Sequence, residues 1–461
     1  MNGAEIKIGK FVENYTGDMI RTLSELVKIP SVKGEPEPTF PFGREPARAL
    51  AKFLDIAEGM GFTVKNHENY VGTIDFFPEG EPTLGILCHL DVVPEGTGWH
   101  TPPYELTLKS GYLYGRGAID DKGPAVSVLY AMYALKRLGV QLSQNVRLIV
   151  GTDEENGSGD LAYYRKKEAL PSRLFTPDGS YPIINVEKGM IRGAFSAPIK
   201  SGDGLKIISL SGGTVINAVP GMCECRIGGY SADKVRSVSA VIGARFDIED
   251  KDGEVIVRTT GKSAHASKPD GGVNALTATL ALLSMLDRNN ETGIGSVFRL
   301  FPFGETDGEH AGVKMSDDVS GALTLVHSVA ECDENEYRGK FDIRFPVSSS
   351  VEKVRSALEA AFSKVGVEIT NISGVEGHYV DENGDFIKTL LQTYEHISGK
   401  RGRCLAIGGG TYVHETEGGV AFGAEFLDDD NRMHSADERM SVDLFKMNTR
   451  MYAEAIIRLC K

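Results

Sequence analysis

Imidazole and carboxylate side chains recur along this chain in an order that suits metal-dependent hydrolysis. The motifs are, in chain order, His89-Leu90-Asp91, Gly117-Ala118-Ile119-Asp120-Asp121, Thr152-Asp153-Glu154-Glu155, Pro177-Asp178-Gly179 and Met433-His434-Ser435-Ala436-Asp437-Glu438. A hydrolytic site with two metal ions needs imidazole and carboxylate ligands, and one further carboxylate to act as a base. A single motif of this kind says little, but the ordered set predicts such a site.

The first motif follows the apolar run of residues 83–88. In a strand, residues i and i+2 point to the same side, so His89 and Asp91 share a face. A ligating histidine usually donates its second ring N–H to a carboxylate, which fixes the tautomer. The spacing therefore predicts that Asp91 orients His89, with two ordinary polar residues at a strand end as the alternative.

The other acidic motifs each have a functional and a plain interpretation. Glycines before Asp120-Asp121 permit the tight backbone that a carboxylate bridging two metal ions requires, whereas a helix N-cap is the alternative. Glu154 and Glu155 are expected at a strand end, where one can bind metal while the other faces the attacking water. A solvated acidic turn is the alternative there, and Asp178 could be an ordinary turn residue. His434 alone could be an exposed residue at a helix start.

Two further segments suit contact with the substrate. His265, in residues 261–267, could stabilise an oxyanion through its imidazole. The loop that contains Gly409, Gly410 and Thr411 lacks the Gly-Lys-Ser/Thr ending of a phosphate loop, so it is interpreted as backbone that approaches the substrate. The inferred ligand set has no thiolate, which favours a catalytic site for zinc, with manganese or cobalt as alternatives.

Composition limits the class of protein. The 461 residues are 41% hydrophobic and 25% charged, as expected of a globular protein with two domains. A net charge of −14 argues against nucleic acid or an anionic membrane as the partner. The first residues lack the apolar run of a signal peptide, and no stretch approaches the ~20 apolar residues of a membrane span. The six cysteines include no Cys-x-x-Cys pair, which indicates reduced thiols and a cytoplasmic location.

Hydrophobic periodicity predicts an α/β arrangement. Helices are expected over residues 11–28, 45–60, 124–138, 274–286 and 351–365. Strands are expected over residues 63–65, 71–76, 83–90, 146–151, 255–259 and 340–345. Site residues gather at the carboxyl ends of strands in such sheets, where His89 and Glu154 fall. We expect residues 1–186 plus 385–461 to form one domain, with residues 187–384 as an inserted α+β domain.

Taken together, these motifs resemble the co-catalytic metallopeptidases, a family that includes carnosinases, aminoacylase, glutamate carboxypeptidases and succinyl-diaminopimelate desuccinylase. The resemblance spans most of the chain and is closest to the bacterial dipeptidase V type. It rests on His89-Leu90-Asp91-Val92-Val93-Pro94, Gly98-Trp99, Ile184-Asn185-Val186-Glu187-Lys188-Gly189 and Gly408-Gly409-Gly410-Thr411-Tyr412. His414-Glu415, after the glycine loop, does not match the family.

The resemblance implies a role for each site residue. One metal would be held by His89, Asp120 and Asp178, and the other by Asp120, Glu155 and His434. Glu154 would be the general base and acid, Asp91 would orient the site, and the Asp120–Asp121 peptide would be cis. The inserted domain would be a lid that places His265 at the scissile carbonyl and Asn217 and Arg344 near the substrate carboxylate. A monomer is implied, with a homodimer as the alternative.

The expected function is therefore a dipeptidase that hydrolyses dipeptides with a free N-terminus, by a metal-bridging water and Glu154. One alternative is a deacylase or desuccinylase of the same fold that acts on N-acyl amino acids. Another is a metal-binding scaffold without catalysis, although the retained Glu154-Glu155 pair argues against it.

Overall fold

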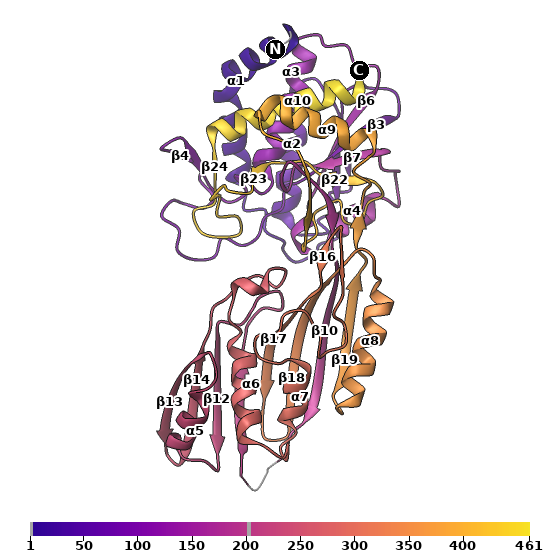
Figure 1. Cartoon of the computed structure of the whole chain (residues 1–461). Helices are drawn as coiled ribbons and strands as arrows, with labels where there is room; N and C mark the ends of the chain where they lie inside the picture. Colours follow the sequence, from indigo (N-terminus) through magenta and orange to yellow (C-terminus); the bar gives the residue numbers. More distant parts are fainter. Residues whose placement is uncertain (1–2, 201–203) are drawn as a thin grey trace. The chain divides into compact units, whose positions relative to one another are not determined.

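The computed structural model describes residues 3–200 and 204–461, which form two compact units. Unit 1 comprises Met1–Asn185, Tyr379–Leu405 and Gly410–Lys461. Unit 2 comprises Val186–His378 and Ala406–Gly409, so it is inserted in sequence between parts of unit 1. Figure 1 shows helices packed on sheets in both units, and the expected α/β fold class is confirmed.

The main sheet of unit 1 is mixed. Its strands run in the spatial order β1 (Thr63–His67), β2 (Val71–Asp75), β6 (Asn145–Gly151), β3 (Pro82–His89), β7 (Arg173–Thr176), β22 (Gly419–Ala421), β9 (Ile183–Glu187) and β20 (His378–Tyr379), with β21 (Cys404–Ile407) paired to β9. β3 is parallel to both β6 and β7, whereas β1, β2 and β6 pair antiparallel. The carboxyl ends of β3, β6 and β7 therefore meet at one edge, where the catalytic motifs begin.

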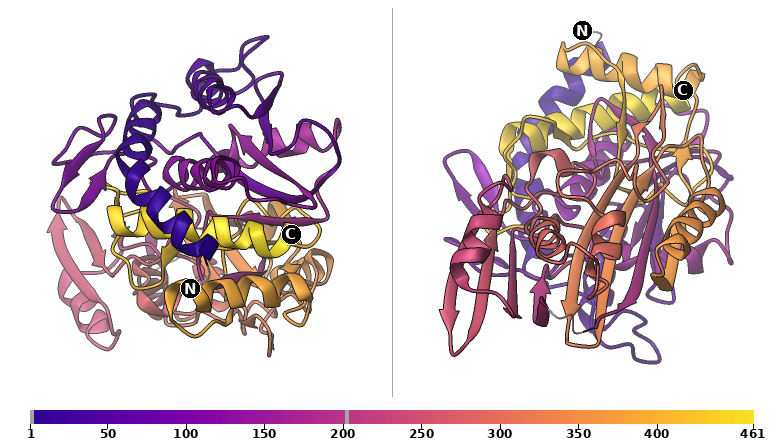
Figure 2. Two further views of the ribbon diagram at one scale, coloured as in Figure 1. Left: turned by 90° about the horizontal axis from the view of Figure 1, so that it is seen from above. Right: turned by 60° about the horizontal axis from the view of Figure 1, so that its bottom comes forward.

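Helices cover this sheet. They are α1 (Gly3–Val27), α2 (Arg44–Gly59), α3 (Lys122–Arg137), α4 (Gly159–Tyr164), α9 (Asp385–Ser398) and α10 (Val442–Cys460). In Figure 2 the C-terminal α10, in yellow, lies beside α1 and α9, and it also packs on α3. A small sheet of β4 (Thr107–Lys109), β5 (Tyr112–Tyr114) and β24 (Arg439–Ser441) leads into α10, and β8 (Ser180–Tyr181) pairs with β23 (Glu425–Phe426).

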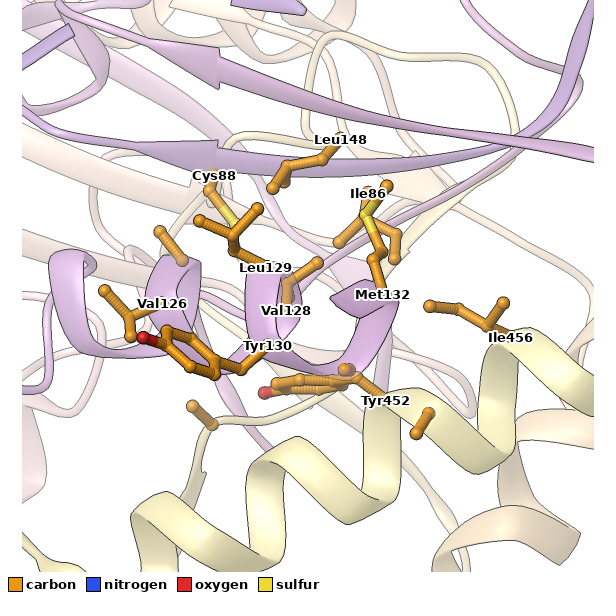
Figure 3. Packing of buried hydrophobic residues seen from close by; sticks show 14 of the residues in the cluster. Ile86, Cys88, Val126, Val128, Leu129, Tyr130, Met132, Leu148, Tyr452 and Ile456 are labelled. Atoms are coloured by element: carbon orange, nitrogen blue, oxygen red, sulfur yellow. The ribbon is translucent and has the colours of Figure 1, made fainter. Parts of the chain in front are cut away.

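The core of unit 1 lies around α3. Figure 3 shows Leu129 and Met132 of this helix packed near Ile86 and Cys88 of β3, with α10 on the other side. The helix is buried along nearly its whole length because it is apolar on all sides. β3 is an unbroken apolar run for the same reason, since both of its faces are covered.

Unit 2 is built on an antiparallel sheet. The strand order is β13 (Arg245–Lys251), β14 (Glu254–Thr260), β12 (Met222–Gly228), β11 (Lys206–Gly212), β17 (Thr324–Cys332), β18 (Glu336–Phe345), β10 (Gly189–Pro198) and β19 (Glu368–Val375). Its helices are α5 (Ala232–Ser239), α6 (Ala275–Leu286), α7 (Ile294–Leu300) and α8 (Val351–Lys364). Fully buried residues alternate with partly exposed ones along β10, which is the pattern of a strand with one covered face. A separate hydrophobic core fills this unit.

The expected helices and strands are present, with ends that differ by a few residues except at the longer α1. One local expectation is wrong. β6 ends at Gly151, and Glu154–Asn156 form a 3-10 turn rather than a strand end. The backbone N–H groups that follow Gly151 donate to the carboxylates of Asp160 and Asp91, so they are not available to continue the strand. None of the helices in the described part of the chain is long and apolar enough to cross a bilayer.

Candidate active site

His89 ends β3, and its imidazole is fully buried. Nδ1 lies 3.0 Å from the carbonyl oxygen of Asp91. Because a carbonyl can only accept, Nδ1 donates, and this leaves Nε2 directed at the neighbouring carboxylates. Nε2 has no hydrogen-bond partner and lies 3.0 Å from Oδ1 of Asp120 and 3.7 Å from Oδ2 of Asp178. A metal ion bound here could contact all three atoms at once.

Asp91 contacts the site in a different way from the one expected. Its Oδ1 is 3.4 Å from Nδ1 of His89, whereas its backbone carbonyl is closer to that nitrogen. The carboxylate oxygens accept hydrogen bonds from the backbone N–H groups of Glu154, at 3.2 Å, and Glu155, at 3.1 Å. Asp91 therefore fixes the histidine through its main chain and the glutamate pair through its side chain.

Asp120 lies between two imidazoles. Oδ1 faces His89, and Oδ2 lies 2.7 Å from Nε2 of His434. Nε2 of His434 is also 3.2 Å from Oε1 of Glu155. The Asp120–Asp121 peptide is cis, as the family resemblance implied. A carboxylate with one oxygen directed at each imidazole has the arrangement of a bridging ligand.

The turn that carries Glu154 and Glu155 is anchored by a buried carboxylate. Asp160 accepts the N–H groups of Thr152, at 2.5 Å, and Asp153, at 2.9 Å, and it also accepts the hydroxyl of Tyr412. Burial is the main cause that raises the pKa of Asp160 to about 6. The neighbouring residue Gly151 has no room for a side chain, since a Cβ would lie 1.7 Å from the Tyr412 hydroxyl.

The acidic and imidazole groups fall into two clusters. His89, Glu154 and Asp178 offer ligand atoms within 4.8 Å of one another, and so do Asp120, Glu155 and His434. Asp178 follows β7, and its N–H donates to Oγ1 of Thr176 at 3.2 Å. Glu154, expected as a base, thus lies beside the first set of ligands.

Electrostatics within these clusters favour a bound cation. Burial, together with the charges of Asp178 and Glu155, raises the pKa of Glu154 well above its ordinary value. Hydrogen bonds to Asp120 and Glu155 raise the pKa of His434 to about 11. Carboxylates crowded in this way repel one another when charged, and a divalent ion in place of the protons would remove that repulsion.

His265 belongs to unit 2. Its Nδ1 accepts the backbone N–H of Ser267 at 3.2 Å and lies 2.7 Å from Oγ of the same serine. The neutral ring therefore carries its proton at Nε2, where it can donate. Burial and the guanidinium of Arg344 lower the pKa of His265, which keeps the imidazole neutral near pH 7.

Arg344 is buried and has partners within unit 2. Its Nε and Nη2 donate to the two carboxylate oxygens of Asp342, at 2.6 and 3.1 Å, and Nη1 donates to the Gly408 carbonyl at 2.6 Å. The fork expected to hold a substrate carboxylate is thus paired with Asp342. A guanidinium has five N–H groups, so two are left for another acceptor.

Asn217 and the first glycines of the loop lie near His265. Ala218, next to Asn217, forms a β-bridge with His265, and the Asn217 carbonyl accepts the N–H of Ala266 at 2.9 Å. A Cβ at Gly408 would lie 2.5 Å from Cβ of Ser267, whereas one at Gly409 would meet nothing within 4 Å. Gly410 and Thr411 follow in unit 1.

Residues 85–458 match the family described as Peptidase family M20/M25/M40. The chain belongs to this family. The M20 match covers every predicted site residue described above, and the chain is accordingly a metallopeptidase.

Its relatives cover nearly the whole chain. YtjP of Bacillus subtilis (strain 168) is 33% identical over 458 residues, which are 96% of this chain and 97% of that protein. The Beta-Ala-Xaa dipeptidase of Lactobacillus delbrueckii subsp. lactis is 33% identical over 476 residues and covers 99% of both chains.

Solved M20 structures share the fold. Human carnosine dipeptidase 1 superposes with a TM-score of 0.61, at 18% identity and with 99% of each chain covered. The di-peptidase Dug1p of Saccharomyces cerevisiae has a TM-score of 0.58 at 14% identity, again with 99% of each chain covered.

The residues of this M20 chain fit two divalent ions. Nε2 of His89 is buried without a hydrogen-bond partner, although it lies among other ligand-type atoms. Two imidazoles and four carboxylates, with no thiolate, suit zinc, manganese or cobalt.

Several buried polar residues within or near the predicted motifs were not predicted to have a role in the site. These are Arg116, Asp160, Tyr412 and Glu438, all of which are at most 1% exposed. Charged side chains are rarely buried unless they are paired, but a single sequence does not show which ones are buried. Their positions close to the predicted ligands were the only available signal.

Proposed function

We propose that this chain is a two-metal dipeptidase that hydrolyses the peptide bond of dipeptides with a free N-terminus. The observation that carries the proposal is the position of Asp120, with one carboxylate oxygen at His89 and the other at His434, beside Glu154 and Glu155. The names of the Lactobacillus relative, of human carnosine dipeptidase 1 and of Dug1p support a dipeptide substrate.

We assign one ion to His89, Asp120 and Asp178 and the other to Asp120, Glu155 and His434. Zinc is the first choice by donor type, with manganese or cobalt as alternatives. When bound, the pair of ions polarises the scissile carbonyl and makes the attacking water more acidic. Six oxygen and nitrogen donors then serve two ions, and Glu154 is left to handle protons.

Glu154 is the proposed general base. Its carboxylate takes a proton from the attacking water and later passes it to the amine that leaves. Asp91 holds the Glu154 backbone at 3.2 Å, and this limits where the carboxylate can reach. Proton transfer depends on such a fixed position, because the base must lie within hydrogen-bond distance of the proton it removes.

We assign the remaining contacts to residues expected from the family resemblance. The Nε2–H of His265 stabilises the negative charge that develops on the carbonyl oxygen. Arg344, through its two remaining N–H groups, and Asn217 bind the substrate carboxylate. Backbone of Gly409, Gly410 and Thr411 contacts the substrate main chain.

The proposal also includes the setting in which the chain acts. We propose a cytoplasmic monomer, with a homodimer as the alternative, that uses neither nucleic acid nor a membrane. The net charge of −14 supports the absence of nucleic acid and membrane partners, because it disfavours binding to polyanions.

The test is hydrolysis by metal-stripped protein, assayed with and without added zinc, manganese or cobalt. Free dipeptides are compared with N-acetyl and N-succinyl amino acids. Cleavage of dipeptides alone, restored by metal, supports the proposal and identifies the effective ion. Activity only on acylated compounds would assign the chain to the deacylases, and inactivity on both would favour the scaffold alternative.

A further inference from the structure

We propose that Glu438 is a positioning residue, which holds the bridging Asp120 in place relative to His434 with Arg116 as its counter-ion. Glu438 lies four residues after His434 in the segment before β24, and its side chain is fully buried. It belongs to neither ligand cluster, so the proposed reaction does not use it directly.

The two oxygens of Glu438 have different partners. Oε1 accepts the backbone N–H groups of Ile119, at 3.0 Å, and Asp120, at 3.3 Å. Oε2 accepts a hydrogen bond from Nη1 of Arg116 at 2.5 Å. One carboxylate thus fixes the main chain at the bridging ligand, while a buried cation fixes the carboxylate.

Arg116 joins this contact to the segment that carries the second histidine. Its side chain is 1% exposed, and Nη2 donates to the carbonyls of Pro94, at 3.2 Å, and Ser435, at 3.5 Å. Its guanidinium also lies over the ring of Trp99, 5.4 Å from the centroid. Ser435 directly follows His434, so the guanidinium restrains the ligand's own segment.

The main chain reinforces the same junction. The N–H of Gly115 donates to the Glu438 carbonyl at 3.0 Å, and pairing continues where Arg439 of β24 lies opposite Tyr114 of β5. Segments 114–120 and 434–439 are therefore held together by backbone and by side chain. Of these contacts, the one that reaches the N–H of Asp120 comes from the carboxylate of Glu438.

This restraint matters because metal ligands tolerate little displacement. Ligand bonds to zinc span only about 2.0–2.2 Å for nitrogen and oxygen donors. Removal of groups that orient such ligands typically costs about 10- to 100-fold in metal affinity. The carboxylate of Asp120 serves both ions in the proposed function, on which this inference rests, and so its backbone anchor affects both.

A buried ion pair can also be purely structural, and the variants separate the two roles. Glu438→Gln keeps an acceptor for the two N–H groups but loses the charge. The double variant Glu438→Met with Arg116→Met removes the pair without leaving an unpaired buried charge, so it is expected to fold. The matched control is Glu454→Met with Arg458→Met, which removes another ion pair, with Nε to Oε1 at 2.7 Å, on α10.

The measurement is calorimetric titration of each metal-free protein with zinc ions, together with its melting temperature. We expect wild type and control to bind two ions per chain with similar dissociation constants. The Glu438/Arg116 double variant should bind at least one ion about 10- to 100-fold more weakly, and Glu438→Gln should fall between. The zinc affinity of the double variant should be lower than that of the control even if the two metal-free proteins have the same melting temperature.

Two different results would refute the positioning role of Glu438 and the metal centre separately. Wild-type dissociation constants in a folded double variant would refute the positioning role and leave the metal centre intact. Failure of the wild-type protein itself to bind two ions would instead refute the metal centre. If the double variant does not fold, unchanged zinc affinity in a folded Glu438→Asp protein, whose side chain is one methylene shorter, would equally refute positioning.

Discussion

Single carboxylates in this site differ in what they can do because the backbone holds each one differently. Asp120 faces two imidazoles, and Glu155 lies beside one of them. Glu154 lies next to Glu155 on the same short turn, but it is the carboxylate that the proposed ligand sets leave over. Proton transfer and metal binding are therefore assigned to adjacent residues, and substitution can separate them.

Glu154→Gln should abolish most turnover and leave metal binding intact. A general base typically contributes about 10²- to 10⁴-fold to the rate, and kcat should fall by that range. Bound metal, measured by elemental analysis, should stay at two ions per chain. The exposed residue Glu417 supplies the matched control, Glu417→Gln. Turnover near the wild-type rate in Glu154→Gln would rule out its role as the base.

His265→Ala should lower kcat without changing metal content. Loss of one donor to a developing oxyanion costs about 10²- to 10³-fold in kcat. Within the described part of the chain, the hydrogen bonds of the imidazole are those of Nδ1 with Ser267, so the melting temperature should change little. His310, an exposed histidine of unit 2 that lies beside Glu305, provides the control variant His310→Ala. Equal kcat in both variants would contradict the assignment.

At the scale of elements, apolar runs were enough to predict where strands end and hence where His89 lies. β3 and β6 are buried runs that stop at the first catalytic motifs, and this is visible in sequence. The hydrogen-bond partners of loop side chains are not visible in the sequence. Asp91 bonds to the N–H groups of Glu154 and Glu155 because of loop geometry that periodicity does not encode.

The turn after β6 depends on the absence of a side chain at Gly151. A Cβ there would lie 1.7 Å from the Tyr412 hydroxyl and 2.2 Å from Oδ2 of Asp160. Gly151→Ala should therefore lower the free energy of unfolding by about 1–3 kcal/mol, as overpacking does. It should also lower kcat, because the displaced residues hold the turn that carries Glu154. Chemical denaturation and steady-state kinetics measure the two effects.

Gly9→Ala is the control for that variant. Gly9 lies inside α1, and a Cβ there meets nothing within 4 Å. The substitution should raise stability by about 0.5–1 kcal/mol, since alanine favours helices. Equal stability changes at Gly151 and Gly9 would show that the close contacts at Gly151 do not matter.

At the scale of the whole molecule, each of the two units has a large hydrophobic core of its own, and each unit should respond to a different perturbation. All proposed metal ligands belong to unit 1. Chelation should therefore lower the unfolding temperature of the calorimetric transition that Gly151→Ala also lowers. A ligand at a hundred times its dissociation constant stabilises by about 2.7 kcal/mol. If chelation left the transition that Gly151→Ala lowers unchanged, this placement would be contradicted.

Unit 2 should lose stability in mild acid through His327. This imidazole is buried, donates from Nδ1 to the Lys340 carbonyl and accepts the Tyr337 hydroxyl at Nε2. Burial lowers its pKa from 6.5 to about 4. Between these values the unfolded chain binds more protons, so stability falls as the pH drops from 6.5 towards 4 and then levels off.

The resulting loss from this group is about 3 kcal/mol. His327→Gln should reduce the acid sensitivity of the unit 2 transition by a similar amount, which calorimetry at several pH values measures. An unchanged pH dependence in this variant would show that other groups control it.

The most direct test of the central claim follows zinc binding and dipeptide cleavage in the same sample of metal-free protein. We expect full activity only once the second ion per chain has bound, because Asp120 places one carboxylate oxygen at each histidine. Full activity with a single ion, or cleavage by the metal-free protein, would contradict a two-metal mechanism.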